Sequence, residues 1–120
     1  MKITLCGSTK FKEDFIAANV ELSLQGHTVY SCASWGHSGD TLSDNEKLIL
    51  DAVHMSKIAN SDAILVINRN GYVGESTRRE IYFAHALGKK VYLYFDESSN
   101  YEFLSPSKSL TGRPGSIKLA

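Results

Sequence analysis

The sequence predicts one α/β domain, with helices on both faces of a doubly wound, mostly parallel sheet of about four to five strands. Apolar runs at residues 2–6, 63–67 and 90–95 are typical of buried parallel strands. Between them, apolar residues recur at helical spacing, so strands and helices alternate. We therefore expect a flavodoxin-like or Rossmann-like domain over residues 1–95 and an irregular C-terminal extension over residues 96–120.

The N-terminal part fits a βαβ unit of about thirty residues. The strand at residues 2–6 runs into Gly7-Ser8-Thr9, a tight turn that leads into a helix. Gly26 ends this helix, and a second strand is expected at residues 27–32. The apolar face that predicts the helix consists of Phe11, Phe15, Ala18 and Leu22.

A long loop and a second helix follow. Residues 33–42 show no periodicity and are interpreted as a loop. Ser43-Asp44-Asn45-Glu46 has the pattern of a capping box, so a helix is expected to begin there and to end at residues 60–62. The predicted inner face of this helix consists of Ile49, Ala52, Val53 and Ser56.

Residues 71–81 are the segment around which the rest of the chain is organised. They join the buried strand at 63–67 to a helix that carries Ile81, Ala84 and Leu87 on one face and ends at Gly88. In open α/β sheets, ligands bind beside such loops, at the carboxyl ends of the strands. We therefore expect the functional site here.

Composition narrows the function classes. The 120 residues fit one domain, and Lys plus Arg equals Asp plus Glu at 13 each. This balance argues against a nucleic-acid polymer or an anionic membrane as partner. We see neither a signal peptide nor a membrane span, so we expect a cytoplasmic protein. Cys6 and Cys32 lack metal-ligand spacing, and Cys6 is interpreted as a small core residue.

Glu80 is the first candidate for chemistry. We expect it in the first turn of its helix, where the helix dipole favours an ionised carboxylate. Such a group suits the nucleophile of a glycosidase. The structural alternative weighs about as much, because Thr77-Arg78-Arg79-Glu80 also matches a capping box in which Glu80 bonds back to the Thr77 amide.

Gly7-Ser8-Thr9-Lys10 is the second candidate. A glycine turn before a helix offers free amides, a hydroxyl and an ammonium group, which suit a phosphate. The same residues also serve as an ordinary helix cap. The phosphate-binding interpretation is strengthened because the strands at 2–6 and 63–67 are expected to place this loop at the same edge of the sheet as residues 71–81.

Other candidates lie near this edge. Trp35, His37 and Asp40 belong to the long loop, which is interpreted as a lid, as a group that stacks on a base or as an ordinary surface loop, and the last of these is favoured. Gly74 allows a tight turn of the backbone. His54 lies on the predicted second helix, and its side chain can face either the sheet or the solvent. The sequence contains no Walker A motif, complete dinucleotide-binding glycine motif or zinc-ligand spacing, and nothing suggests a Ser-His-Asp triad.

Three segments together resemble the nucleoside 2-deoxyribosyltransferase superfamily. They are Leu5-Cys6-Gly7-Ser8, residues 60–66 and residues 74–91, and the resemblance covers roughly residues 2–95. Its most specific part is a glycine, a short gap, Glu-Ile, a nearby alanine, then Leu-Gly-Lys and a strand. The form of the motif looks closest to a bacterial or phage branch.

The resemblance implies that Glu80 is a nucleophile that attacks C1′ of a ribose or deoxyribose. Water or a second base then completes a retaining double displacement. It also implies a 5′-phosphate grip at Gly7 and Ser8, assisted by Lys10. Neither a metal nor an organic cofactor is required, and association into a homo-oligomer is expected. The remaining candidate substrate-binding residues are Trp35, Gly74 and Ser76.

Two positions depart from the pattern of that superfamily. His54 stands where an aspartate is usual, and Gly74 stands where Asp or Ser is usual. Histidine exchanges a proton near neutral pH, so His54 either replaces the aspartate as an acid or marks a lost or changed reaction.

These observations leave three alternative candidate functions. The first is an N-glycosidase or deoxyribosyltransferase that acts on a nucleoside or its 5′-monophosphate. The second is a non-catalytic nucleotide-binding module that uses the same pocket. The third, an interaction protein on this scaffold, leaves the placed Gly, Ser and Glu residues unexplained.

Overall fold

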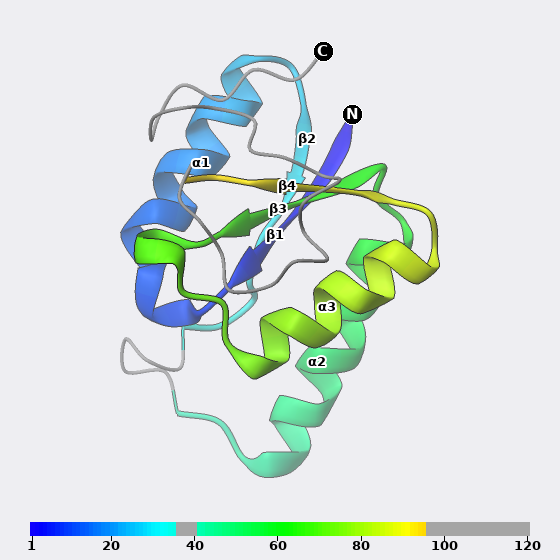
Figure 1. The fold of residues 1–120 in the computed structure, drawn as a ribbon. Helices are drawn as coiled ribbons and strands as arrows, with labels where there is room; N and C mark the ends of the chain where they lie inside the picture. Colours follow the sequence, from blue (N-terminus) through cyan, green and yellow to red (C-terminus); the bar gives the residue numbers. More distant parts are fainter. Residues whose placement is uncertain (36–40, 96–120) are drawn as a thin grey trace.

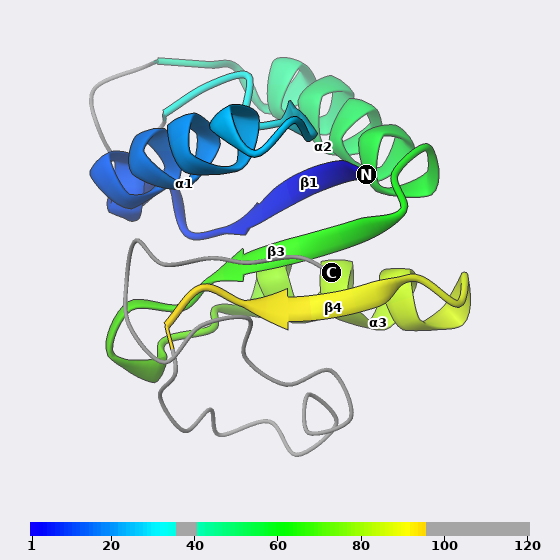
Figure 2. The same cartoon turned by 90° about the horizontal axis from the view of Figure 1, so that it is seen from above.

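The computed structural model describes residues 1–35 and 41–95, in which four parallel strands form one sheet in the order β2-β1-β3-β4. The doubly wound α/β class is therefore confirmed. Figure 2 shows β1, β3 and β4 side by side with their arrows in the same direction. The strands are β1 (Lys2–Gly7), β2 (Thr28–Tyr30), β3 (Ala63–Ile67) and β4 (Lys90–Leu93), and the α-helices are α1 (Lys12–Leu24), α2 (Asp44–Ala59) and α3 (Glu75–Ala86).

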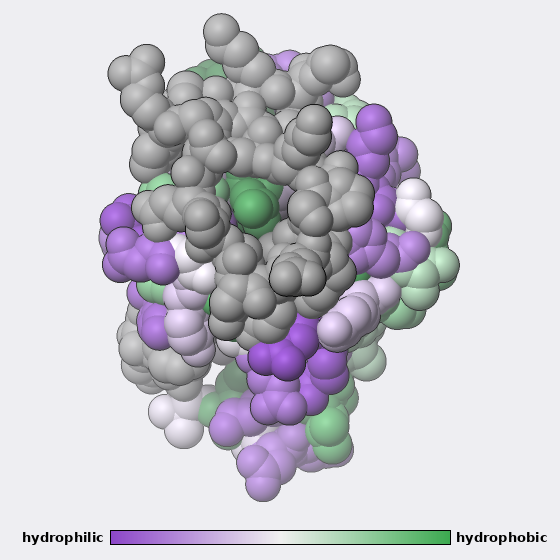
Figure 3. Space-filling model, in the orientation of Figure 1, coloured by the Kyte–Doolittle hydropathy of each residue, from purple (hydrophilic) through white to green (hydrophobic). Residues whose placement is uncertain are grey.

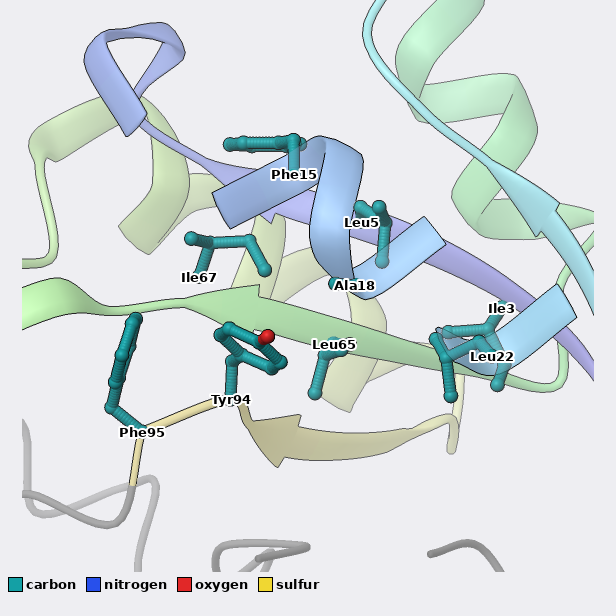
Figure 4. Packing of buried hydrophobic residues seen from close by; sticks show 9 residues of the cluster. All are labelled: Ile3, Leu5, Phe15, Ala18, Leu22, Leu65, Ile67, Tyr94 and Phe95. Atoms are coloured by element: carbon teal, nitrogen blue, oxygen red, sulfur yellow. The ribbon is translucent and has the colours of Figure 1, made fainter. Parts of the chain in front are cut away.

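Helix α1 covers one face of the sheet, and α2 and α3 cover the other (Figure 1). Alternation along the strands produces both cores, because successive side chains point to opposite faces. On β1, for example, Ile3 and Leu5 pack toward α1, whereas Cys6 packs toward α2 and α3. Figure 4 shows the core under α1, in which Phe15, Ala18 and Leu22 of the helix meet Ile3, Leu5, Leu65 and Ile67 of the strands.

Both outer strands are shorter than predicted. Strand β2 ends at Tyr30 rather than at residue 32, and β4 ends at Leu93 rather than at residue 95. Beyond β4, the buried Asn68 side chain replaces the strand pairing. Its amide nitrogen donates to the Phe95 carbonyl at 3.1 Å, and its oxygen accepts from the Phe95 amide at 2.9 Å. The predicted extension over 96–120 lies outside the described residues.

The inner face predicted for α2 was wrong. Ile49, Ala52 and Val53 are exposed, whereas Ile58 is buried and His54 is half-buried. The first turns of α2 extend past the sheet (Figure 1), so no strand lies beneath the helix there to cover its apolar side chains. Only the last turns of the helix reach the core.

The predicted start of α3 was also wrong. The N-cap is Gly74, not Thr77, and the Arg78 amide already donates to the Gly74 carbonyl at 2.9 Å. Thr77 lies within the helix and is buried, and no side chain caps the N-terminus. Because the helix begins earlier, Glu80 lies one turn deeper than the capping-box interpretation requires.

None of the helices in the described ranges is long and apolar enough to cross a membrane.

Gly7 has a backbone that only glycine tolerates well. Its φ is +145°, and a Cβ built there would lie 2.8 Å from the Ile67 carbonyl oxygen. Gly26 is a matched control, because its φ is also positive, at +91°, but a Cβ would meet nothing within 4 Å.

We predict that Gly7→Ala destabilises the fold more than Gly26→Ala does. Positive φ alone costs about 1–2 kcal/mol per alanine, and the clash with Ile67 adds roughly 1–3 kcal/mol. Denaturant unfolding of both variants measures the difference. Equal losses would mean that β1 and β3 can separate at this point without cost.

Candidate active site

A cavity of about 790 Å³ opens at the carboxyl ends of β1 and β3, bounded by the N-terminal half of α3 and by α2. This volume falls within the range of small-molecule sites. Hydrophilic residues gather over the N-terminal part of α3 (Figure 3), where Glu75, Ser76 and Arg79 are exposed. The cavity therefore lies at the edge of the sheet where the sequence places the candidate residues.

All of the predicted site residues except Trp35 line this cavity: Gly7, Ser8, Lys10, His54, Gly74, Ser76 and Glu80. Trp35 packs on the other side of the sheet, where its ring meets Phe15 edge to face at 5.2 Å. The structure thus does not bring Trp35 to the pocket. His37 and Asp40, from the same loop, lie outside the described residues.

Glu80 projects from the second turn of α3 and is 17% exposed. Its Oε1 lies 3.4 Å from Nε2 of His54, which is 15% exposed on α2. The capping role is excluded by this position, because Gly74 begins the helix. Glu80 is thus a half-buried carboxylate that contacts an imidazole on a second helix, and both groups are candidates for chemistry in the cavity.

Cys6 completes a three-residue group at the floor of the site. Its Sγ lies 3.6 Å from the same His54 Nε2. Burial raises the pKa of the Cys6 thiol well above its usual range, and the charge of Glu80 and a hydrogen bond to Glu80 raise it further. Cys6 is therefore a protonated thiol rather than a nucleophile. Cys6 is the core residue that the sequence predicts. Its position beside His54 and Glu80 was not predicted.

The Gly7-Ser8-Thr9-Lys10 loop forms one wall. Ser8 caps a short 3-10 helix, Thr9–Phe11, and its hydroxyl accepts from the Lys10 amide at 3.4 Å. Lys10 Nζ lies 3.7 Å from the centre of the Tyr72 ring, a cation–π contact. The capping interpretation is therefore correct, and it leaves the Ser8 hydroxyl and the Lys10 ammonium at the pocket wall.

Several lining residues were not predicted, among them Tyr72, Lys47 and Asp51. Lys47, Asp51 and His54 recur at intervals of four and three residues, so they share one side of α2. This spacing was visible in the sequence, but the exposed apolar residues of α2 drew the prediction to another face. Tyr72 lies within residues 71–81, and nothing in that local pattern indicates its contact with Lys10.

The fold is that of nucleoside 2-deoxyribosyltransferase-like proteins, as two solved structures show. One is a 2-deoxyribosyltransferase from the psychrotolerant bacterium Bacillus psychrosaccharolyticus, with a TM-score of 0.69, 20% identity, and coverage of 90% of this chain and 82% of that one. The other is a CMP N-glycosidase from Clostridium botulinum, with a TM-score of 0.60, 19% identity, and coverage of 90% and 83%. No family model matches the chain, and no curated protein matches its sequence.

Cys32 provides a test of the electrostatics at the site. Burial and the nearby charge of Glu80 raise the pKa of its thiol to about 11. We predict that iodoacetamide alkylates native Cys32 at pH 8 roughly tenfold more slowly than a free thiol. The raised pKa leaves roughly 100-fold less thiolate, whereas the more basic thiolate is roughly tenfold more nucleophilic.

The raised pKa also fixes the direction of the pH effect. Native Cys32 holds its proton above the pH at which the unfolded thiol loses it, so the resulting stability is present below about pH 9 and is lost as the pH rises toward 11. Mass spectrometry of Cys6→Ala protein between pH 8 and 11 measures the alkylation rate. A rate that levels off near pH 9 would contradict the burial of this thiol.

Proposed function

We propose that the protein is an enzyme that cleaves the N-glycosidic bond of a nucleoside or nucleoside 5′-monophosphate. The observation that carries this proposal is the Glu80–His54 contact of 3.4 Å in a cavity of about 790 Å³. It pairs a carboxylate nucleophile with a group that can protonate the departing base. The likeness to a deoxyribosyltransferase and an N-glycosidase supports the same class of reaction.

In the first step, a Glu80 oxygen attacks C1′ of the sugar, and the bond from C1′ to the base nitrogen breaks. The electron pair of that bond stays on the base, which takes a proton from His54. An ester between Glu80 and the sugar results. In the second step, water or another base attacks C1′, loses a proton to His54 and releases Glu80. Two inversions at C1′ retain the configuration.

The surroundings of Glu80 suit this role. It lies in the second turn of α3, beyond the first turn where the helix dipole acts most strongly, so its side-chain contacts decide its environment. His54 Nε2 lies 3.4 Å from Glu80 Oε1, and the Cys6 sulfur lies within 4.8 Å of the carboxylate. Contacts from β1 and α2 thus hold the side chain in one orientation, which lowers the cost of reaching the transition state.

The 5′-phosphate is assigned to the Ser8 and Lys10 wall. Lys10 lies on the Tyr72 ring, so its ammonium is already held at the pocket before any ligand arrives. Lys47 lines the same cavity from α2 and adds a second positive charge. These cations favour a nucleotide over a neutral nucleoside.

A non-catalytic nucleotide-binding module remains the second candidate. The specific observation in its favour is His54, which stands at the position of the usual aspartate. Asp51 also lines the cavity, one turn before His54, so a carboxylate is present near that position after all. Release of free base by the wild-type protein distinguishes the enzyme from the binding module.

We predict that Glu80→Gln lowers base release at least about 1,000-fold, because the amide is not a nucleophile. The measurement is free-base release from a panel of ribo- and deoxyribonucleosides and their 5′-monophosphates. Glu13→Gln, an exposed change on α1, is the matched control and keeps full activity. Thermal stabilisation by a nucleotide with no base release from wild-type protein would establish the binding module instead.

We predict that Ser8→Ala combined with Lys10→Ala raises KM for 5′-monophosphates about 10- to 100-fold. Each charge-assisted hydrogen bond contributes about 1.5–3 kcal/mol, part of which water replaces. KM for nucleosides changes little. Lys90→Ala, an exposed change at the start of β4, is the control. Equal losses for both substrate classes would show that this wall does not hold the phosphate.

We also propose a homo-oligomer. Leu48, Ile49 and Val53 are 68%, 54% and 44% exposed on α2, the helix that supplies His54 to the pocket. A second copy that covers this face would bury these side chains. We predict that Ile49→Lys with Val53→Lys lowers the mass measured by sedimentation, whereas Val20→Lys on α1 does not. An unchanged mass would place the interface elsewhere.

A further inference from the structure

Three different ligand-type atoms converge at the floor of the site. They are Cys6 Sγ, His54 Nε2 and one carboxylate oxygen of Glu80, and all lie within 4.8 Å of one another. Each comes from a different element, namely β1, α2 and α3. None of the spacings in the sequence indicates a metal site, because only the tertiary fold brings these residues together.

Two of the three separations match the edges of a zinc tetrahedron, and the third, from the sulfur to the carboxylate oxygen, is within 4.8 Å. With Zn–S of about 2.3 Å and Zn–N and Zn–O of about 2.0–2.1 Å, tetrahedral angles place sulfur and nitrogen about 3.6 Å apart, and nitrogen and oxygen about 3.4 Å apart. The structure has Sγ to Nε2 at 3.6 Å and Nε2 to Oε1 at 3.4 Å. A cation would therefore enter without any large movement of the backbone.

The ligand set selects the kind of metal. A thiolate, an imidazole and a carboxylate together suit a borderline-soft cation such as Zn²⁺ and do not suit Mg²⁺ or Ca²⁺, which take oxygen ligands. His54 and Glu80 line the cavity, whereas Cys6 is buried behind them. The fourth coordination position would thus face the pocket and be available to water.

We propose that Cys6, His54 and Glu80 form a Zn²⁺ site that switches the enzyme off. The metal site itself stands on the geometry alone, and only its inhibitory effect rests on the proposed function. On binding, the Cys6 thiol loses its proton to solvent, and His54 and Glu80 each donate a lone pair to the metal.

Inhibition follows from the same three bonds. The Glu80 oxygen that would attack C1′ is held by the metal, and His54 Nε2 has no proton to give to the base. The metal-bound form therefore takes no part in the reaction.

The binding test uses the full chain after treatment with a chelator, with Co²⁺ as a spectroscopic probe and Zn²⁺ as competitor. We expect a thiolate-to-cobalt charge-transfer band in the near ultraviolet, visible bands of tetrahedral cobalt, and loss of both on addition of Zn²⁺. No charge-transfer band in wild-type protein overturns the proposal. This readout needs no turnover, so it is independent of whether the protein is a glycosidase.

Variants assign the ligands. Cys6→Ser and His54→Gln should each weaken Zn²⁺ binding at least about 100-fold. Cys32→Ser is the matched control, because Cys32 is the other free thiol near Glu80 but lies outside the group of three ligand atoms. It should leave the cobalt spectrum unchanged. A band that persists in Cys6→Ser and disappears in Cys32→Ser would overturn the assignment.

Cys6 is buried, so circular dichroism must first show that Cys6→Ser is folded. If it is not, Cys6→Ala and His54→Gln, a change at a half-buried position, provide the test instead. In the activity arm, stoichiometric Zn²⁺ should suppress base release by wild-type and Cys32→Ser protein at least tenfold, with recovery on chelation. If zinc binds at these residues but does not slow a measurable base release, the inhibitory role is overturned and only the metal site stands.

Discussion

The pairing of β1 with β3 is the constraint on which the site depends. The two strands run parallel from Ile3 opposite Ala63 to Gly7 opposite Ile67, so both chains leave the sheet at the same edge. The glycine at position 7 allows them to stay paired to the last residue, because any larger residue would strike the Ile67 carbonyl. Without this close pairing, the Ser8 loop and the N-terminus of α3 would not share one cavity.

His54 is the residue that the proposed reaction and the proposed metal site have in common. Its Nε2 lies between Cys6 Sγ and Glu80 Oε1, at 3.6 and 3.4 Å. With a proton on Nε2, the imidazole supports an acid role beside an ionised glutamate. With a cation in its place, the same three residues become ligands. A single nitrogen therefore connects the two states, and occupation by one excludes the other.

The interactions that hold the outer sheet edge differ from those at the centre. Asn68, directly after β3, forms two hydrogen bonds with the Phe95 backbone, and Arg69 forms two with the Asp14 carboxylate at 2.7 Å each. These polar contacts tie the end of β4 and the start of α1 to the loop that precedes α3. The loop that carries Tyr72 is thus anchored both to the segment after β4 and to α1.

The sequence by itself determined the parallel α/β class, the strand at 63–67, and the edge at which Glu80, Ser8 and Lys10 gather. These follow from local patterns, namely continuous apolar runs, glycine turns and helical spacing, which act over a few residues. Tertiary structure alone decided that α2 turns His54 rather than Val53 inward, and that Trp35 packs on Phe15 away from the pocket. It also placed Cys6 beside Glu80, because contacts between residues 74 positions apart arise from packing across the sheet and leave no periodic trace in the chain.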